Sequence, residues 1–215
     1  LFTSRPVGDA MATTIWGTSS SWTLTALPLF VWMGEILFRT KLSENLFKGL
    51  APWMSRLPGG LIHVNVVGCA LFAAISGSSA ATVATVGKMS IPELRKRNYP
   101  EKLLLGSLAG SGTLGLLIPP SIILIIYGVT VQESIAKLFI AGIIPGIMIA
   151  LIFMGYVIVW SLLNKNKMPT NYENFSFLNK LSKSKQLIPV ILLILGVIGS
   201  IYTGIATATE AASLG

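Results

Sequence analysis

The sequence predicts an all-α integral membrane protein, and three observations support this fold class. Apolar residues make up 53% of the chain, charged residues only 11%, and the mean hydropathy is +0.74. Apolar runs alternate with short basic segments. Two of these runs are interrupted by small polar residues or prolines, a pattern typical of transporters that bind ions and substrates at broken helices. The net charge of +8 is dispersed between the apolar runs, so no nucleic-acid partner is expected.

The first 57 residues are expected to hold N-terminal spanning segments and an interfacial helix. Residues 1–21 are rich in Thr and Ser and suit the end of a preceding span or an extramembrane turn. The first complete span is predicted from Trp22 to Phe38, with a kink at Pro28.

The charges that follow indicate where this span ends. Glu35 lies four residues before Arg39, and this spacing predicts an ion pair at the helix end rather than a proton carrier. Residues 39–57 alternate basic and apolar positions. They predict an amphipathic helix that lies on the membrane, with Trp53 at the level of the lipid headgroups.

Residues 58–87, PGGLIHVNVVGCALFAAISGSSAATVATVG, predict a re-entrant helical hairpin. The run carries no charge and is broken by Ser76-Gly77-Ser78-Ser79. Helical arms of about a dozen residues, with ~1.5 Å of rise each, reach roughly half-way through a ~30 Å hydrocarbon core. The break would therefore lie at midplane depth, where non-helical backbone is tolerated only inside protein or beside a watery cavity.

A second uncharged run, residues 103–130, predicts a broken transmembrane helix and follows a charged connection at residues 88–102. Three glycines and the pair Pro119-Pro120 lie within its middle. The prolines remove two amide donors and disfavour helix before them, so an unwound midsection is expected. Residues 58–130 together would form half of a transport domain.

The rest of the chain is expected to supply scaffold helices over residues 131–203. Long apolar spans are predicted at residues 138–164 and 186–203, joined by a polar, lysine-rich loop at 165–185. Residues 204–215 would open a second, inverted repeat, so that the sequence presents the first repeat only.

The positive charges support the hairpin independently of its serines and glycines. If the hairpin returns to the side from which it enters, segments 39–57, 88–102 and 165–185 share one side and hold 14 of the 16 Lys and Arg residues. Only Arg5 and Lys137 then lie opposite. A full crossing would divide the charges far more evenly, so the positive-inside rule favours the re-entrant path, entered from the cytoplasm.

The residue types at the first break suit an ion and an anion. Ser76, Ser78 and Ser79 offer hydroxyl oxygens, Gly77 lets the backbone turn, and the end of the first arm presents carbonyls, which together make a hard-oxygen site for Na⁺. The second arm is expected to begin at about Ala80, and its first amides suit a substrate carboxylate.

The second break is expected to add Gly112, Thr113 and the carbonyls before Pro119, with the Ser121 side chain capping the resumed helix. The candidate residues for binding substrate and ion are therefore Ser76, Gly77, Ser78, Ser79, Gly112, Thr113, Pro119, Pro120 and Ser121, of which Ser78, Ser79 and Thr113 are the predicted Na⁺ ligands.

Three further patterns are interpreted as structural. Glycines four residues apart, Gly106 with Gly110 and Gly142 with Gly146, indicate close helix packing. His63 stands alone at the entrance of the hairpin, so an interfacial role is expected rather than metal binding.

The motifs resemble a known family, the large membrane subunit of TRAP (tripartite ATP-independent periplasmic) transporters, also termed DctM-like permeases. The most specific likenesses are the hairpin tip AISGSSAAT and the break GTLGLLIPPS, in this order and spacing. One departure is Ala208 in TATEA, where the family usually reads TPTEA. The likeness covers nearly the whole chain from about residue 24 and also includes residues 26–38, 57–87, 91–100, 112–129 and 138–146.

The resemblance implies a multi-pass elevator-type transporter of the bacterial inner membrane that imports organic acids with Na⁺. C4-dicarboxylates or sialic and other sugar acids are the substrate class it suggests, and no cofactor other than the coupling ion is expected. A periplasmic binding protein would deliver the substrate, and a smaller four-helix membrane subunit would be the partner. The hairpin would face the broken helix.

Two alternatives stay open from the sequence. The first is a proton-coupled or uncoupled anion carrier of the same architecture. The second is an intramembrane serine hydrolase that uses Ser78 or Ser79 as nucleophile. Lys88 lies too far along the second arm to serve as its base, and the sequence contains no G-x-S-x-G motif, so no enzyme activity is expected.

Overall fold

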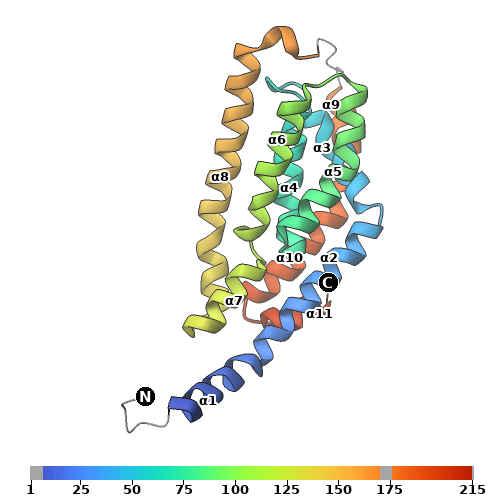
Figure 1. The fold of residues 1–215 in the computed structure, drawn as a ribbon. Coiled ribbons are helices and arrows are strands. Elements are labelled where there is room, and N and C mark those ends of the chain that lie inside the picture. Colours follow the sequence, from blue (N-terminus) through green and yellow to red (C-terminus); the bar gives the residue numbers. More distant parts are fainter. Residues whose placement is uncertain (1–6, 170–175, 215) are drawn as a thin grey trace.

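The computed structural model describes residues 7–169 and 176–214, and every regular element in these ranges is a helix (Figure 1). The elements are α1 (Val7–Ser19), η1 (Trp22–Thr25), α2 (Ala26–Arg39), α3 (Leu42–Met54), α4 (Ile62–Ser76), α5 (Ser79–Lys96), α6 (Glu101–Gly112), η2 (Thr113–Leu116), α7 (Ile122–Val131), α8 (Ile135–Leu163), η3 (Lys165–Lys167), α9 (Phe177–Ser184), η4 (Lys185–Leu187), α10 (Ile188–Tyr202) and α11 (Ala208–Leu214).

Long apolar helices confirm the membrane character of the fold. In the described part of the chain, segments Ile135–Leu163 and Phe177–Tyr202 are each long and apolar enough to cross a membrane. A third crossing results if α1 and the segment Trp22–Arg39, bent by 43° at the break between them, count as one span. Apolar side chains on α8 face outward, with Ile144 77% exposed, as expected for a surface in contact with lipid.

Helix α4 is the centre of the fold. Twelve of its 15 residues are buried, because it is apolar on all sides and packs against α5, α6, η2, α3, α2 and α8. By contrast, only five of the 29 residues of α8 are buried. The first arm of the hairpin thus lies inside the protein, whereas α8 lies along one side of it (Figure 1).

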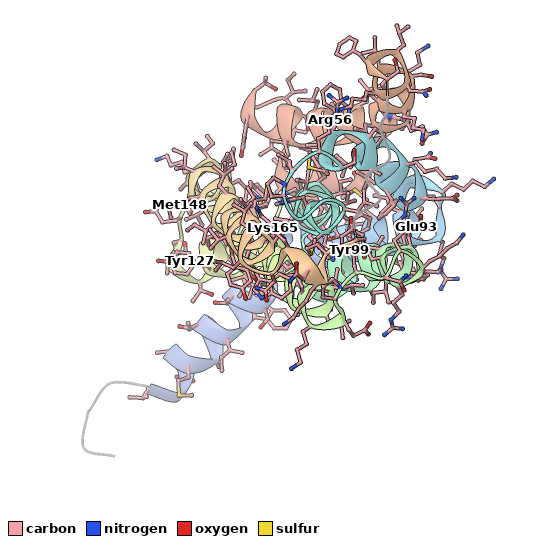
Figure 2. The ribbon with its side chains drawn as sticks, turned by 90° about the horizontal axis from the view of Figure 1, so that it is seen from above. Arg56, Glu93, Tyr99, Tyr127, Met148 and Lys165 are labelled. Carbon is pink, nitrogen blue, oxygen red and sulfur yellow. The ribbon has the colours of Figure 1, made fainter. Side chains whose placement is uncertain are left out.

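The chain follows the path that the hairpin prediction requires. Helix α4 runs to a break at Gly77–Ser78, and α5 returns beside it to the end where α4 began (Figure 1). The three lysine-rich and arginine-rich segments accordingly meet at this one end, which is seen from above in Figure 2 with Arg56 and Lys165 labelled. We call it the basic end. How the hairpin lies relative to a membrane, and the division into transport and scaffold domains, stay predictions.

Several predictions about the N-terminal part need correction. Residues 7–19 form a helix, and the bend lies between Ser19 and Trp22 rather than at Pro28. Pro28 is the third residue of α2, in the first turn, where a helix does not need its amide. The predicted ion pair between Glu35 and Arg39 is confirmed at 2.8 Å.

The amphipathic segment is a helix, but its apolar face lies on protein. Helix α3 packs against α4, α9 and η4, and Leu46 and Leu50 are buried in that contact. The Trp53 indole nitrogen donates to Ser184 Oγ at 2.8 Å. Neighbouring helices therefore cover the apolar face of this segment, and its position on the membrane stays a prediction.

Two predicted connections are shorter than expected. Helix α5 continues through the charged residues to Lys96, because its polar side chains face outward at the basic end, and the connection is only residues 97–100. The predicted loop 165–185 contains η3, α9 and η4. Within it, residues 170–175 lie outside the described part of the chain.

Candidate functional site

The hairpin tip is a two-residue break between α4 and α5. Gly77 adopts a left-handed conformation with φ of +60°, and Ser78 is extended with φ of −127°. The Ser78 hydroxyl accepts a hydrogen bond from the Ala81 amide at 3.4 Å, so it caps α5. The second arm therefore begins at Ser79, one residue earlier than predicted.

A small hydrogen-bond network fixes the inside of this tip. The Ser76 and Thr82 hydroxyls lie 3.0 Å apart, and both side chains are fully buried. The Thr82 hydroxyl also donates to the Ser78 carbonyl at 2.7 Å. Ser76 is thus occupied within the hairpin, and it is less able to serve as a ligand than the sequence suggested.

The second break is longer. Helix α6 tightens into η2, the chain then runs without helix to Ser121, and the Pro119-Pro120 peptide bond is cis. Ser121 stands at the N-cap position of α7, but its hydroxyl donates to the Leu116 carbonyl at 2.6 Å and makes no capping bond. The prediction that its side chain caps α7 was wrong, because the unpaired carbonyl across the break takes this donor.

The two breaks meet in space. The Ile122 amide, at the start of α7, donates to the Gly77 carbonyl at 3.2 Å. A Cβ added to Gly77 would lie 2.7 Å from the Pro120 carbonyl oxygen. On the other side, a Cβ on Gly115 would lie 2.8 Å from the Ser79 nitrogen and 2.9 Å from the Ser78 carbonyl carbon. The second break therefore contacts the hairpin tip through backbone, and glycines make this approach possible.

The predicted Na⁺ ligands differ in their surroundings. The hydroxyl of half-buried Ser79 has no hydrogen-bond partner in the described part of the chain, and that of Ser78 is engaged only by the long bond from Ala81. Thr113 is exposed, and its hydroxyl donates to the Gly110 carbonyl at 2.7 Å within its own helix. Of the three, Ser79 is the hydroxyl most available to an ion.

Three residues that shape the site are not among the candidates predicted from the sequence. Thr82, one helical turn after Ser78, closes the tip network, and a hydroxyl at this spacing from a capping serine was the available signal. Gly115 is one of the three glycines of the second break, and its contact with the backbone of Ser78 and Ser79 could not be predicted from the sequence. Gly34 on α2 lets that helix approach the tip, because an added Cβ would lie 3.2 Å from Ser76 Cβ. No local signal marks Gly34, since its role depends on the packing of α2.

The site contains neutral oxygens and no charge of its own. Neither residues 58–87 nor residues 103–130 include an Asp, Glu, Lys or Arg. Within the described residues, no group of three His, Cys, Asp or Glu could hold a metal ion. Binding at the breaks therefore depends on hydroxyls, carbonyls and amides, which suit Na⁺ and other hard, weakly held ions better than transition metals.

The other predicted structural residues have mixed outcomes. Gly142 and Gly146 pack as expected, against Leu117 and Ile118 in the second break. Gly106 was predicted to pack closely, but nothing lies within 4 Å of an added Cβ because this face of α6 is exposed. His63 is fully buried rather than interfacial, with its Nε2 2.8 Å from the Pro58 carbonyl oxygen.

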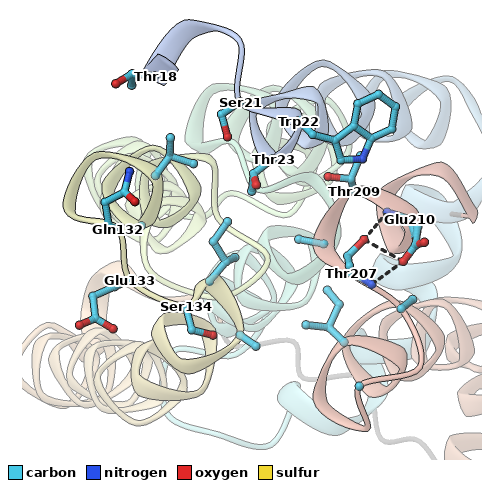
Figure 3. A pocket seen from close by; sticks show the side chains of 18 of the residues that line it. Thr18, Ser21, Trp22, Thr23, Gln132, Glu133, Ser134, Thr207, Thr209 and Glu210 are labelled. Carbon is cyan, nitrogen blue, oxygen red and sulfur yellow. Dashed lines mark hydrogen bonds between the residues drawn. The ribbon is translucent and has the colours of Figure 1, made fainter. Parts of the chain in front are cut away.

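A separate pocket of about 680 Å³, with mixed polar and apolar lining, opens at the end opposite the basic end (Figure 3). Trp22 and Thr23 lie on one side of it, and Gln132 and Ser134 lie across from them. Glu210 lines it too, but this carboxylate accepts hydrogen bonds from the amide and hydroxyl of Thr207, both at 2.8 Å, and so caps α11. These bonds hold the pKa of Glu210 below its ordinary value.

The resemblance implied that the hairpin faces the broken helix, and the contact between the two breaks agrees with it. The model of the tripartite ATP-independent periplasmic transporter, DctM component, matches residues 1–215. The chain belongs to this family. Together with the apolar helices, membership makes it part of a multi-pass membrane transport protein, and the resemblance seen in the motifs is confirmed.

Relatives in the family are similar along nearly the whole chain. The C4-dicarboxylate TRAP transporter large permease protein DctM of Pseudomonas aeruginosa is 35% identical over 205 residues, which cover 95% of this chain and 47% of that protein. The isethionate TRAP transporter permease protein DctMQ of Oleidesulfovibrio alaskensis is 36% identical over 214 residues, covering 98% and 33%. The sialic acid TRAP transporter permease protein SiaT of Haemophilus influenzae is 35% identical over 192 residues, covering 89% and 31%.

The chain spans about a third to a half of the length of these relatives. Their names describe transporter permeases, so the family is one of transporters and not of enzymes. The hydrolase alternative is therefore set aside. As a tripartite system, the family implies a small membrane subunit and a periplasmic binding protein.

Proposed function

We propose that the chain forms half of a Na⁺-coupled importer of small organic anions in the bacterial inner membrane. A periplasmic binding protein supplies the substrate, and a small four-helix membrane subunit pairs with the chain. The relatives named for C4-dicarboxylate, isethionate and sialic acid support an acidic substrate, since each of these compounds carries a carboxylate or sulfonate.

The observation that carries this proposal is the contact between the two breaks. The hydrogen bond from the Ile122 amide to the Gly77 carbonyl joins the hairpin tip to the broken helix, next to the free hydroxyl of Ser79. Na⁺ would take oxygens from Ser79, Ser78 and the surrounding carbonyls, because no carboxylate is present to bind it.

The same tip offers a place for the anion. Helix α5 has 18 residues and begins at the break, so its first amides and the positive end of its dipole point into this region. An ion and a carboxylate that share one tip stabilise each other, and coupling between them is reciprocal. In the elevator mechanism that we propose, the hairpin and the broken helix move as one body, which their backbone contacts favour.

The test is uptake by the full-length protein, with its small subunit and binding protein, in proteoliposomes. Ser79→Ala should raise the Na⁺ concentration for half-maximal uptake about five- to thirtyfold, as expected for losing ~1–2 kcal/mol of ligand interaction. Saturating Na⁺ should restore most of the substrate affinity. Thr113→Ala is the matched control, since its exposed hydroxyl already bonds within its own helix, and it should change the Na⁺ dependence less than twofold.

The results of these uptake measurements distinguish Na⁺ coupling from proton coupling and from uncoupled transport. If Ser79→Ala kept the parent's Na⁺ dependence, the ion would have to bind elsewhere. Uptake that follows a proton gradient at constant Na⁺ would favour the proton-coupled alternative, and uptake independent of both would favour an uncoupled carrier. Repeating the titration with Li⁺ tests whether the oxygen site selects by ion size.

A further inference from the structure

A pocket at the basic end is not explained by the transport site. It has a volume of about 400 Å³ and lies between the link that follows α3 and the end of α8. Arg56 stands on the first segment and Lys165 on the second (Figure 2). No carboxylate is among the described residues that line it, which are Arg56, Leu57, Pro58, Gly59, Ser161, Leu162, Lys165, Met168 and Pro169.

The two cations differ from several others at this end. Four basic side chains there have a carboxylate partner: Arg39, Lys48, Arg95 and Arg97. Arg56 and Lys165 have neither an ion pair nor a side-chain hydrogen bond within the described ranges. Among the described residues, two positive charges thus share a concave site with no carboxylate beside them, and this arrangement favours a bound anion.

The pocket is held in shape by its backbone. On one side, the Gly60 amide donates to the Leu57 carbonyl at 2.8 Å. On the other, the Met168 amide donates to the Lys165 carbonyl at 3.1 Å. Gly59, with φ of +102°, presses against α8, since an added Cβ would lie 2.6 Å from Val157 Cγ1. Both cations therefore lie next to hydrogen-bonded turns, which fix the backbone on the two sides of the pocket.

The surroundings indicate the kind of anion. Beside the pocket, the outward face of α8 is apolar, and Val159 and Leu163 are 56% and 79% exposed. An anion that enters the pocket would therefore stand beside a surface suited to acyl chains. Basic pockets at the cytoplasmic ends of membrane helices bind the phosphate groups of anionic lipids.

We propose that the pocket between Arg56 and Lys165 binds a phosphate group, supplied by the headgroup of an anionic phospholipid whose acyl chains follow α8. The two cations contact the phosphate oxygens, and Leu162 and Met168 cover the first part of the acyl chain. The bound lipid would join the link before α4 to the end of α8 at the cytoplasmic surface. Inorganic phosphate shares this chemistry, and the experiment separates the two sources.

The experiment measures lipid binding by native mass spectrometry of the purified full-length protein. Phosphatidylglycerol and phosphatidylcholine of identical acyl chains are titrated separately, and inorganic phosphate is added as a competitor. Arg56→Gln and Lys165→Gln should each weaken phosphatidylglycerol binding about fivefold, the effect of ~1 kcal/mol per basic residue near anionic lipid. Binding of phosphatidylcholine should hardly change.

Lys167→Gln is the matched control. It removes the same charge two residues from Lys165, on the same turn, but Lys167 does not line the pocket, so phosphatidylglycerol affinity should stay within twofold. Equal weakening by all three variants would mean a diffuse surface potential and would overturn the proposal. If millimolar phosphate displaced phosphatidylglycerol completely, the pocket would not prefer the lipid to free phosphate. This result would overturn the proposal and assign the pocket to soluble anions.

Discussion

The two breaks differ in how they are built. The hairpin tip needs only Gly77 and Ser78 between two helices, and the hydrogen bonds of Ser76, Ser78 and Thr82 stay within the hairpin. The second break has a turn of 3₁₀ helix, a proline pair and a serine that bonds back across the gap. The tip is thus a local turn stabilised by its own residues, whereas the second break depends on what it packs against, chiefly the tip.

The largest loss of uptake is expected at Gly77, which both forms the turn of the hairpin tip and contacts the second break. Gly77→Ala forces a residue with Cβ into a left-handed conformation, which costs ~1–2 kcal/mol, and also places that Cβ 2.7 Å from the Pro120 carbonyl oxygen. The variant should lose most uptake and unfold at a clearly lower temperature in detergent. Gly155→Ala is the control, because nothing lies near its Cβ and alanine suits a helix better. Unchanged uptake in Gly77→Ala would show that the tip does not need this geometry.

The next variant separates the breaks without straining a turn. Gly115→Ala keeps an ordinary 3₁₀ conformation but drives Cβ against the backbone of Ser78 and Ser79. Uptake should fall at least about tenfold, because a shift near 1 Å in a site costs on the order of 100-fold. Gly110→Ala is matched to it, since its added Cβ meets the movable ring of Phe153 at 3.0 Å. If the two variants transported equally well, contact between the breaks would be dispensable.

A smaller loss of stability is expected when single hydroxyls are removed from the two breaks. Ser121→Ala removes the only side-chain hydrogen bond across the second break among the described residues and leaves the Leu116 carbonyl unpaired, at a cost of ~1–3 kcal/mol. Ser76→Ala should cost less, about 0.5–1.5 kcal/mol, because Thr82 keeps its bond to the Ser78 carbonyl. Thermal unfolding of both variants measures the difference. If Ser76→Ala lowered the unfolding temperature more than Ser121→Ala, the tip would depend more on its side-chain bonds than the second break does.

The smallest effect concerns the turn between α5 and α6, far from both breaks. Arg95 holds the pKa of the Glu101 carboxyl below its ordinary value through a charged hydrogen bond. A lowered pKa stabilises the fold above the unfolded value of about 4.3, and this contribution disappears as the pH falls below it. The unfolding temperatures of the parent and Glu101→Gln should differ slightly at neutral pH and converge in acid. If the gap between the two unfolding temperatures changed between pH 6 and pH 8, this would contradict the prediction, because Glu101 does not titrate there.

The basic end could also be predicted from charge alone, but its pocket could not. The positive-inside count requires only that the three segments share a side, and the structure brings them to one end. Arg97 pairs with Glu93 at the i,i+4 spacing of one helix, a local pattern, whereas Arg56 and Lys165 line one pocket only because the link after α3 and the end of α8 lie side by side. No pattern within either segment specifies this placement.

The sequence by itself determined the helical membrane class, the positions of both breaks and the family, because these follow from local composition: apolar runs long enough to span, a glycine where the chain must turn, and prolines that cannot continue a helix. Tertiary structure alone decided which oxygens remain available. Thr113 bonds within its own helix, Ser76 bonds to Thr82, and Ser79 is left free. The physical reason is that these hydroxyls bond to partners nearby in the chain, whereas the approach of the two breaks, held by the bond from the Ile122 amide to the Gly77 carbonyl, decides which oxygens face one site.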